Sequence, residues 1–203
     1  MKRVTNLVSA PSQQPIDVLD VKDQLRLDYD YDTEDTFLDR LVAAATKRIE
    51  GLTGRKLITQ TWQAFWDAWP AKADGFEVPF GQLQSVTHVQ YTDTDDSATT
   101  WNASQYEVDT YGDPGRIKLA YGCSYPTATL QVVNPIEVQF VCGYGLSEED
   151  VPEDLRHAMK LLIGHWFENR EGALGMPGLT AFVEIPEGVH DLIRDYVIWG
   201  FHW

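Results

Sequence analysis

A helical pattern of apolar residues between residues 151 and 171 is the most regular feature of the chain. The apolar positions are Leu155, Ala158, Met159, Leu162, Ile163, Trp166 and Phe167. This i, i+3, i+4, i+7 spacing marks the buried face of one helix. Pro152 suits the first turn of a helix, and Glu153 and Asp154 are favoured at the positive end of the helix dipole. We predict that this helix is the centre of the fold and that the aromatic pair at its end contacts other parts of the chain.

Two further helices are predicted upstream. A short helix over residues 21–27 has Asp20 as its N-cap and turns Val21 and Leu25 inward. A longer helix over residues 33–53 carries apolar residues at helical spacing and ends at Gly54. Residues 1–16 show no periodicity and contain two prolines, which predicts an extended, partly mobile arm.

The middle of the chain, residues 57–143, changes to a β pattern that is rich in Thr, Val and aromatic residues. Strands are predicted at residues 58–69, 76–80, 85–91, 98–101, 106–110, 116–120 and 136–142. The last strand alternates in character, and a Pro-Gly turn over residues 111–115 joins the two strands before it into a hairpin. We predict a compact antiparallel β module that is inserted between the helices.

The C-terminal part contains a Gly- and Pro-rich stretch over residues 172–178 and a short helix that Pro186 opens. Together these patterns predict an α+β fold with a helical core, in which a long central helix packs on the N-terminal helices. An antiparallel β module is inserted into this core, and an extended C-terminal tail follows it. The predicted parts are residues 1–56 (arm and N-terminal helices), 57–145 (β module), 146–175 (central helix) and 176–203 (tail with a short helix and an aromatic end).

Charge is distributed unevenly along the chain, whose formal net charge is −15. Residues 57–151 carry 3 basic and 13 acidic side chains and so contribute −10. Because a grip on phosphates requires Lys and Arg, this acidic middle argues against tight nucleic-acid binding, although DNA could pass nearby without sticking. No apolar run reaches the ~20 residues of a membrane span, and the N-terminus lacks the apolar segment of a signal peptide. We expect a soluble protein that is made in the cytoplasm and has no membrane partner.

An acidic turn between the first two predicted helices resembles a calcium loop. Its possible ligands are Asp28, Asp30, Asp32, Glu34 and Asp39. Two departures argue against calcium, because Thr33 replaces the required glycine and Asp39 is shorter than the expected glutamate. A solvated acidic helix start is the preferred interpretation.

Candidate catalytic residues are few. His157 and His165 lie eight residues apart on the predicted central helix, but a di-iron centre needs matching carboxylates from other helices. Ser124 and Ser147 lack the context of a nucleophile elbow. The sequence therefore predicts a protein that is not an enzyme and that holds no cofactor and no metal.

Four aromatic residues stand within the last eight positions of the sequence, and they are Tyr196, Trp199, Phe201 and Trp203. Two interpretations stay open. The aromatic residues fold back onto the central helix and meet Trp166 and Phe167, or they insert into another protein as anchors.

Three segments carry a resemblance to a known family. They are Glu50-Gly-Leu-Thr-Gly-Arg55, Leu57-Ile-Thr-Gln-Thr-Trp62 and Gly164-His-Trp-Phe-Glu-Asn-Arg170. Over most of residues 16–172 the chain resembles the head–tail connector (adaptor) proteins of tailed bacteriophages and gene transfer agents.

The resemblance implies a structural virion protein at the head–tail interface. It implies a ring of twelve subunits that docks under the portal protein, lets double-stranded DNA pass through its lumen without sequence-specific binding, and receives a stopper or tail-completion protein below. In this family the C-terminal tail commonly engages the portal, which favours Tyr196, Trp199, Phe201 and Trp203 as portal-binding residues. The family has no catalytic residues to transfer.

Other functions remain open at this point. One is a different component of the same vertex, such as a stopper. Another is a calcium-dependent binding module that uses residues 28–39, which a metal-dependent shift in melting temperature would reveal. A third is a small enzyme, which would require polar groups that converge near His157 or His165.

Overall fold

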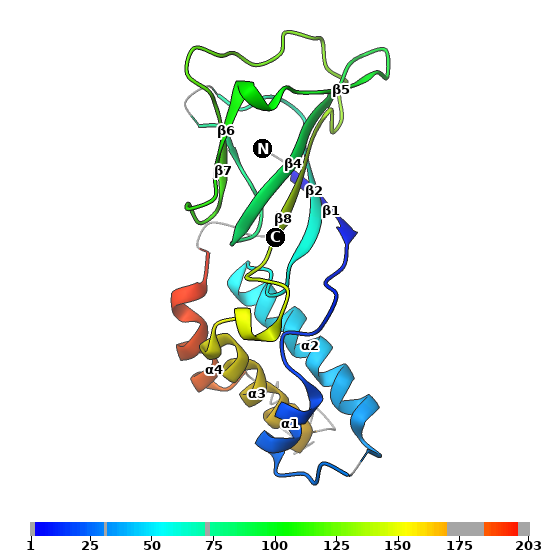
Figure 1. The fold of residues 1–203 in the computed structure, drawn as a ribbon, viewed down its shortest axis with the longest axis vertical. Coiled ribbons are helices and arrows are strands. Elements are labelled where there is room, and N and C mark those ends of the chain that lie inside the picture. Colours follow the sequence, from blue (N-terminus) through cyan, green and yellow to red (C-terminus); the bar gives the residue numbers. More distant parts are fainter. Residues whose placement is uncertain (1–2, 31, 72–73, 170–184, 199–203) are drawn as a thin grey trace, which may run out of the picture. The chain divides into compact units, whose positions relative to one another are not determined.

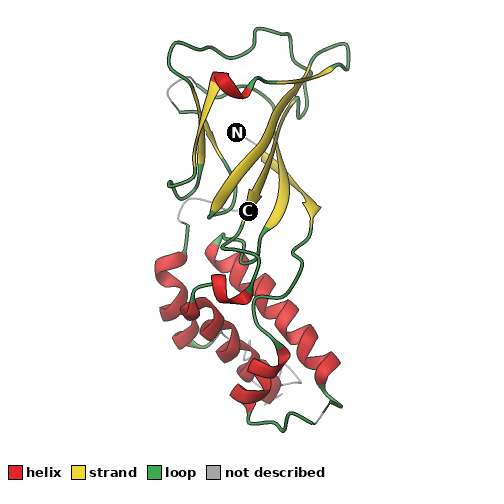
Figure 2. Cartoon of the chain, in the orientation of Figure 1, coloured by secondary structure: helices red, strands yellow, loops and turns green. Residues whose placement is uncertain are grey.

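The computed structural model describes residues 3–30, 32–71, 74–169 and 185–198, and the chain divides into two compact units. The β unit comprises residues 1–12 and 59–144, and the helical unit comprises residues 13–58 and 145–203. Figure 2 shows the strands in the former and the α-helices in the latter. This architecture confirms the predicted α+β fold class. Residues 1–12 group with the strands, whereas the sequence patterns had placed them with the helices.

Four α-helices and two short 3-10 helices form the described part of the helical unit. They are α1 (Val18–Leu25), α2 (Asp35–Thr53), η2 (Glu148–Asp150), α3 (Glu153–Glu168), α4 (Glu187–Ile193) and η3 (Arg194–Tyr196). Helix α3 contacts α1, α2 and α4, which confirms its predicted central position (Figure 1). Its buried residues are Leu155, Ala158, Met159, Leu162 and Ile163, as the periodicity predicts. The aromatic pair at its end is half-buried, and the Phe167 ring lies 6.3 Å from that of Phe37 on α2.

The ends of the helices follow local capping rules. Helix α1 begins earlier than predicted because Asp17, not Asp20, is its N-cap, and the Asp17 side chain accepts a hydrogen bond from the Leu19 N–H at 3.1 Å. Asp20 instead pairs with Lys160 of α3 at 3.2 Å. Helix α2 ends at Gly54 as predicted, with φ of 72°, a left-handed conformation that costs glycine little.

Lys22 is buried in the helical unit, which the sequence patterns did not predict. Only 2% of its side chain is exposed, and its ammonium group lies 2.6 Å from the Asp35 carboxylate at the start of α2. The same group donates a hydrogen bond to the Tyr29 carbonyl at 3.2 Å. Because a buried ammonium group needs such partners, Lys22 joins α1, the acidic turn and α2.

Eight strands form two antiparallel sheets within the described residues of the β unit. They are β1 (Arg3–Ser9), β2 (Gln60–Trp66), β3 (Phe76–Glu77), β4 (Leu83–Thr92), β5 (Ala98–Thr100), β6 (Tyr106–Asp109), β7 (Arg116–Leu119) and β8 (Ile136–Cys142), with a 3-10 turn η1 (Ala103–Gln105) before β6. One sheet has the order β1-β2-β8-β4-β5 and the other β3-β7-β6. The predicted hairpin of β6 and β7 is confirmed, and so is the alternation of buried and half-buried residues along β8.

Strand β1 lies where the sequence predicted an extended arm. Its residues pair with β2 from Arg3 opposite Trp66 to Ser9 opposite Thr61. The strand lies at the edge of its sheet and its apolar side chains are largely exposed. The sequence therefore shows no alternation of apolar and polar residues that would predict a strand here.

An aromatic cluster centred on Trp69 packs against the core of the β unit. The Trp69 ring stacks on Tyr125 at a centroid distance of 5.1 Å and meets Phe76, Tyr91 and Trp101 edge to face. The Trp101 indole N–H donates a hydrogen bond to the Gln105 side chain at 2.6 Å. Such tilted and stacked ring pairs stabilise a core beyond the area that they bury.

Candidate functional site

The C-terminal segment of the helical unit packs on the central helix. Helix α4 contacts α3, and Val189 and Ile193 are the buried residues of α4. Pro186 immediately precedes α4, as the sequence predicts. Val189 and Ile193 are therefore part of the core of this unit.

Ile198 fixes the last described stretch to the end of α2. Its backbone N–H donates a hydrogen bond to the Thr53 carbonyl at 2.9 Å, and only 8% of the residue is exposed. A Cβ atom at Gly54 would lie 3.6 Å from the Ile198 Cβ, so the side chain passes directly over the glycine. The chain is thus held to its own helical unit as far as residue 198.

Tyr196 is bound to the same unit by both its side chain and its backbone. Its hydroxyl lies 3.1 Å from the carboxylate of Asp154 in the first turn of α3, and its carbonyl accepts a hydrogen bond from the Arg55 guanidinium. Burial raises the pKa of the Tyr196 hydroxyl, and the hydrogen bond to Asp154 raises it further. In this subunit Tyr196 therefore acts as an attachment point for the C-terminal segment.

The other three aromatic residues predicted to bind the portal, Trp199, Phe201 and Trp203, lie outside the described residues. The role of all four as portal-binding residues stays a prediction. The structure adds that Tyr196 has partners within its own chain, at the start of α3 rather than at the Trp166 and Phe167 end. Asp154 and Arg55 were not predicted from the sequence to be partners of Tyr196.

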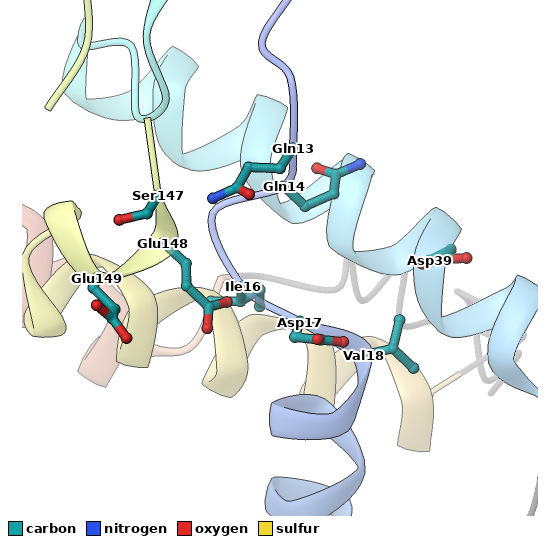
Figure 3. Close-up of a pocket in the computed structure, with 9 residues that line it drawn as sticks. All are labelled: Gln13, Gln14, Ile16, Asp17, Val18, Asp39, Ser147, Glu148 and Glu149. Atoms are coloured by element: carbon teal, nitrogen blue, oxygen red, sulfur yellow. The ribbon is translucent and has the colours of Figure 1, made fainter. Parts of the chain in front are cut away.

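A second surface feature of the helical unit is an open groove of about 470 Å³ (Figure 3). We call it the acidic groove, and it is lined by Gln13, Gln14, Ile16, Asp17, Val18, Asp39, Ser147, Glu148 and Glu149. Figure 3 shows these side chains coming from the stretch before α1 and its first residue, from α2, and from the N-cap and first residues of η2. Glu148 extends from η2 toward the beginning of α1. The groove therefore brings together residues more than a hundred positions apart in the sequence.

Hydrogen bonds order one wall of the acidic groove. The Ser147 backbone N–H and hydroxyl both donate to Asp150 at 2.9 Å, which forms a capping box around η2. These bonds hold the pKa of the Asp150 carboxyl below its usual value. Glu148 and Glu149 are thereby presented on an ordered turn. The Ser-x-x-Asp spacing is visible in the sequence and was the signal that could have found this wall.

Of the other candidate residues, Asp39 and Ser147 line the acidic groove, and among the described residues none of the candidates is part of a metal-binding group. Asp28, Asp30, Asp32 and Asp39 are exposed, Glu34 is half-buried, His157 and Ser124 are exposed, and His165 and Ser147 are half-buried. Among the described residues, no group of three or more His, Cys, Asp and Glu side chains is arranged to hold a metal ion. No described helix is both long enough and apolar enough to cross a membrane.

A comparison with protein families gives the chain its identity. The profile of the family described as Phage gp6-like head-tail connector protein matches residues 15–117. The chain belongs to this head–tail connector family. The matched range includes two of the three segments that carried the resemblance, and residues 164–170 lie beyond it. Comparison with curated proteins gave no match.

Solved structures similar to the connector come from gene transfer agent (GTA) particles. A chain of "Neck of empty GTA particle computed with C6 symmetry" is 26% identical, with a TM-score of 0.76 and 98% of each chain covered. A chain of "Virion of native gene transfer agent (GTA) particle" is 26% identical, with a TM-score of 0.74, and 97% of the connector and 98% of that chain are covered. A chain of "Neck of native GTA particle computed with C12 symmetry" is 25% identical, with a TM-score of 0.71 and 98% of each chain covered. The connector is thus a structural component of the virion at the head–tail interface.

Proposed function

We infer that the connector assembles into a ring of twelve copies beneath a portal protein, with a stopper or tail-completion protein below. The observation that carries this proposal is the similarity over 98% of the chain to a neck chain from a particle computed with C12 symmetry. A closed cyclic assembly uses two different, complementary surfaces on each copy, so the fold has to supply both. In this role the connector is a structural part and not an enzyme.

Double-stranded DNA passes through the lumen of the proposed ring without sequence-specific binding. The net charge of −15 per chain supports this part of the proposal, because a negatively charged surface repels phosphates rather than gripping them. Weak affinity suits a conduit, since DNA that stuck to the wall would be slowed during ejection.

The C-terminal end of the connector binds the portal in this proposal. Tyr196 and Ile198 fix the chain to the helical unit, so Trp199, Phe201 and Trp203 follow directly on an attached segment. Large aromatic side chains are favoured anchors in protein interfaces. We therefore assign portal contact to these three residues, with Tyr196 holding the base of the segment.

A truncation after Ile198 tests the portal assignment. This variant keeps the Tyr196–Asp154 and Ile198–Thr53 hydrogen bonds, and so it should fold with an unchanged melting temperature. Binding to the purified portal, measured by co-elution and light scattering, should be lost. A full-length variant with serine at positions 199, 201 and 203 separates the effect of the aromatic side chains from that of chain length.

The two variants have to agree for the assignment to stand. Loss of portal binding in both, with folding retained, supports aromatic anchoring. Portal binding at wild-type strength in the serine variant would contradict it. A large drop in melting temperature on truncation would show instead that the last five residues belong to the core of their own subunit.

A further inference from the structure

The solvent-facing side of α2 is basic, although the chain as a whole is strongly acidic. Arg40, Ala44, Lys47 and Arg48 are exposed and follow the i, i+4, i+7, i+8 spacing of one helix face. This face lies opposite the buried one, whose members include Leu38, Val42, Ala45 and Ile49. We call these four exposed residues the basic face of α2. Ala44 adds little bulk between the cations, which leaves them accessible to another surface.

Most other cations of the helical unit already have a partner within it. Lys22, Lys56, Arg156, Lys160 and Arg194 form ion pairs, and Arg55 donates to the Tyr196 carbonyl. Among the described residues of this unit, Arg26, Arg40, Lys47 and Arg48 are the cations whose side chains form neither an ion pair nor a hydrogen bond. Three of these four lie on the basic face of α2, so the unpaired positive charge is gathered in one place.

A ring brings acidic helical units close together, and the unpaired cations on the basic face of α2 can offset the repulsion between them. Residues 13–58 and 145–203 carry 11 basic and 21 acidic side chains, a net charge of −10, so neighbouring helical units repel one another at close range. In a head-to-tail ring, each interface joins one surface of a subunit to a different surface of the next. Repulsion is avoided where a basic surface meets an acidic one.

The acidic groove provides such a complementary surface. It carries the carboxylates of Asp17, Asp39, Glu148 and Glu149 and is lined by no lysine or arginine (Figure 3). Asp17 and Glu149 are exposed and Glu148 is half-buried, so their charge is available to another molecule. The capping box fixes the turn that presents the two glutamates.

We propose that the basic face of α2 docks against the acidic groove of the adjacent copy of the same chain. The proposal rests on the ring that the proposed function assumes, and it deepens that function by naming the two surfaces that join subunits. Arg40, Lys47 and Arg48 of one copy face Glu148, Glu149 and Asp17 of the next. The surfaces are different and complementary, which suits a closed ring rather than a two-fold dimer.

A second copy fits the basic face better than DNA does. Three cations on a unit of net charge −10 make a poor phosphate-binding surface, because DNA affinity depends on displacing counterions with many basic residues. Carboxylates of known position on the same chain are opposite in sign to these cations, so every ring already contains a suitable occupant.

Charge reversal with rescue tests the pairing. We would reverse the basic face with Arg40→Glu and Arg48→Glu in one variant, and the groove with Glu148→Lys and Glu149→Lys in another. Each variant alone places like charges across every interface, and its self-association should weaken by roughly tenfold or more. An equimolar mixture of the two should recover assembly, because an alternating ring places opposite charges across every interface. A single chain that carries all four substitutions should recover it as well.

Matched variants control for net charge. The double variant Arg26→Glu and Arg194→Glu changes the net charge by the same amount as the variant with the reversed basic face. Both of its arginines are exposed residues of the helical unit. Asp28→Lys with Asp30→Lys matches the reversed groove. Both controls should assemble like the wild type. All proteins are compared by light scattering with and without the portal, after circular dichroism has verified their folding.

The behaviour of the wild-type protein distinguishes a failure of the proposed pairing from a failure of the proposed ring. Assembly of the wild type, loss in both reversals and recovery in the mixture support the proposed pairing. Assembly of the wild type together with full assembly of either reversal overturns the pairing but leaves the ring intact. Loss in both reversals without recovery in the mixture also overturns it and points to the portal or DNA as the occupant of α2. A wild type that forms no ring, even with the portal, overturns the proposed function itself.

Discussion

Replacement of Lys22 by methionine is the perturbation for which the structure gives the sharpest expectation. Lys22 is 2% exposed, and its ammonium group binds the Asp35 carboxylate at 2.6 Å and the Tyr29 carbonyl at 3.2 Å. Methionine retains a flexible apolar side chain of similar length, so it keeps most of the packing and removes the charge. The substitution therefore isolates the polar contribution of Lys22 to the joint between α1, the acidic turn and α2.

The magnitude follows from how the partners are solvated after the change. Hydrogen bonds to charged groups contribute about 1.5–3 kcal/mol, and a fully buried orphan charge would cost more than that. The Asp35 side chain as a whole is 41% exposed, although the Oδ1 atom that faces Lys22 is buried, so water can solvate the carboxylate only in part once the ammonium group is gone. We expect Lys22→Met to lower the free energy of unfolding by about 1–2 kcal/mol. Lys22→Ala, which also removes the packed stem, should lower it by about 2–4 kcal/mol.

Urea unfolding with a double-mutant cycle provides the assay. The cycle combines Lys22→Met with Asp35→Asn and should give a coupling energy of about 1–2 kcal/mol between the two side chains. Because the cycle subtracts the effect of each single substitution, the interaction of Asp35 with the α2 dipole does not enter this value. Lys160→Met is the matched control, because its ion pair with Asp20 is longer, 3.2 Å, and its side chain is 17% exposed rather than 2%. That control should cost less than ~1 kcal/mol. An unchanged or higher stability of Lys22→Met would refute the view that this buried pair stabilises the helical unit.

Three further outcomes are expected. Leu162 is fully buried on α3, and Leu162→Ala should lower the free energy of unfolding by about 2–5 kcal/mol in a urea titration. Leu146 is 68% exposed, and Leu146→Ala should change the same free energy by less than ~0.5 kcal/mol. Trp101→Ala should lower the free energy of unfolding by about 3–5 kcal/mol and remove much of the near-ultraviolet circular dichroism, because the residue is 3% exposed within the aromatic cluster. A loss under ~1 kcal/mol would mean that the cluster does not stabilise the β unit. The lowered pKa of Asp150 means that its hydrogen bonds from Ser147 stabilise the fold above the usual carboxyl value of 3.8 and lose that effect as pH falls through the folded value. The stability difference between wild type and Asp150→Asn should therefore shrink between pH 7 and pH 3, and a constant difference would argue against this linkage.

Periodic elements of the connector were predictable from the sequence because burial on one face leaves a repeating pattern. Helix α3 shows this best, since its buried residues are those of the 3.6-residue period. Strand β8 shows the same for a period of two. The pairing of β6 with β7 followed from the turn residues between them.

Features that depend on distant partners left no such pattern. Strand β1 is recognisable only through its pairing with β2, which no local alternation encodes. Lys22 is a polar residue on an inner face, and its partner Asp35 lies thirteen positions away beyond an acidic turn. The acidic groove joins residues 13–18 to residues 147–149, so only the folded chain reveals it. The basic face of α2 was not predicted, and the absence of partners for its cations among the described residues becomes apparent only from the ion pairs of the folded chain.

Electron microscopy of the connector bound to its portal tests the central claim most directly. We expect class averages with a twelve-fold ring against the portal and a mass of about 276 kDa for the ring, twelve times the 23.0 kDa of one chain. The same images should show a central lumen. A connector that stays a single copy on the portal, or that binds it without forming any ring, would contradict the account.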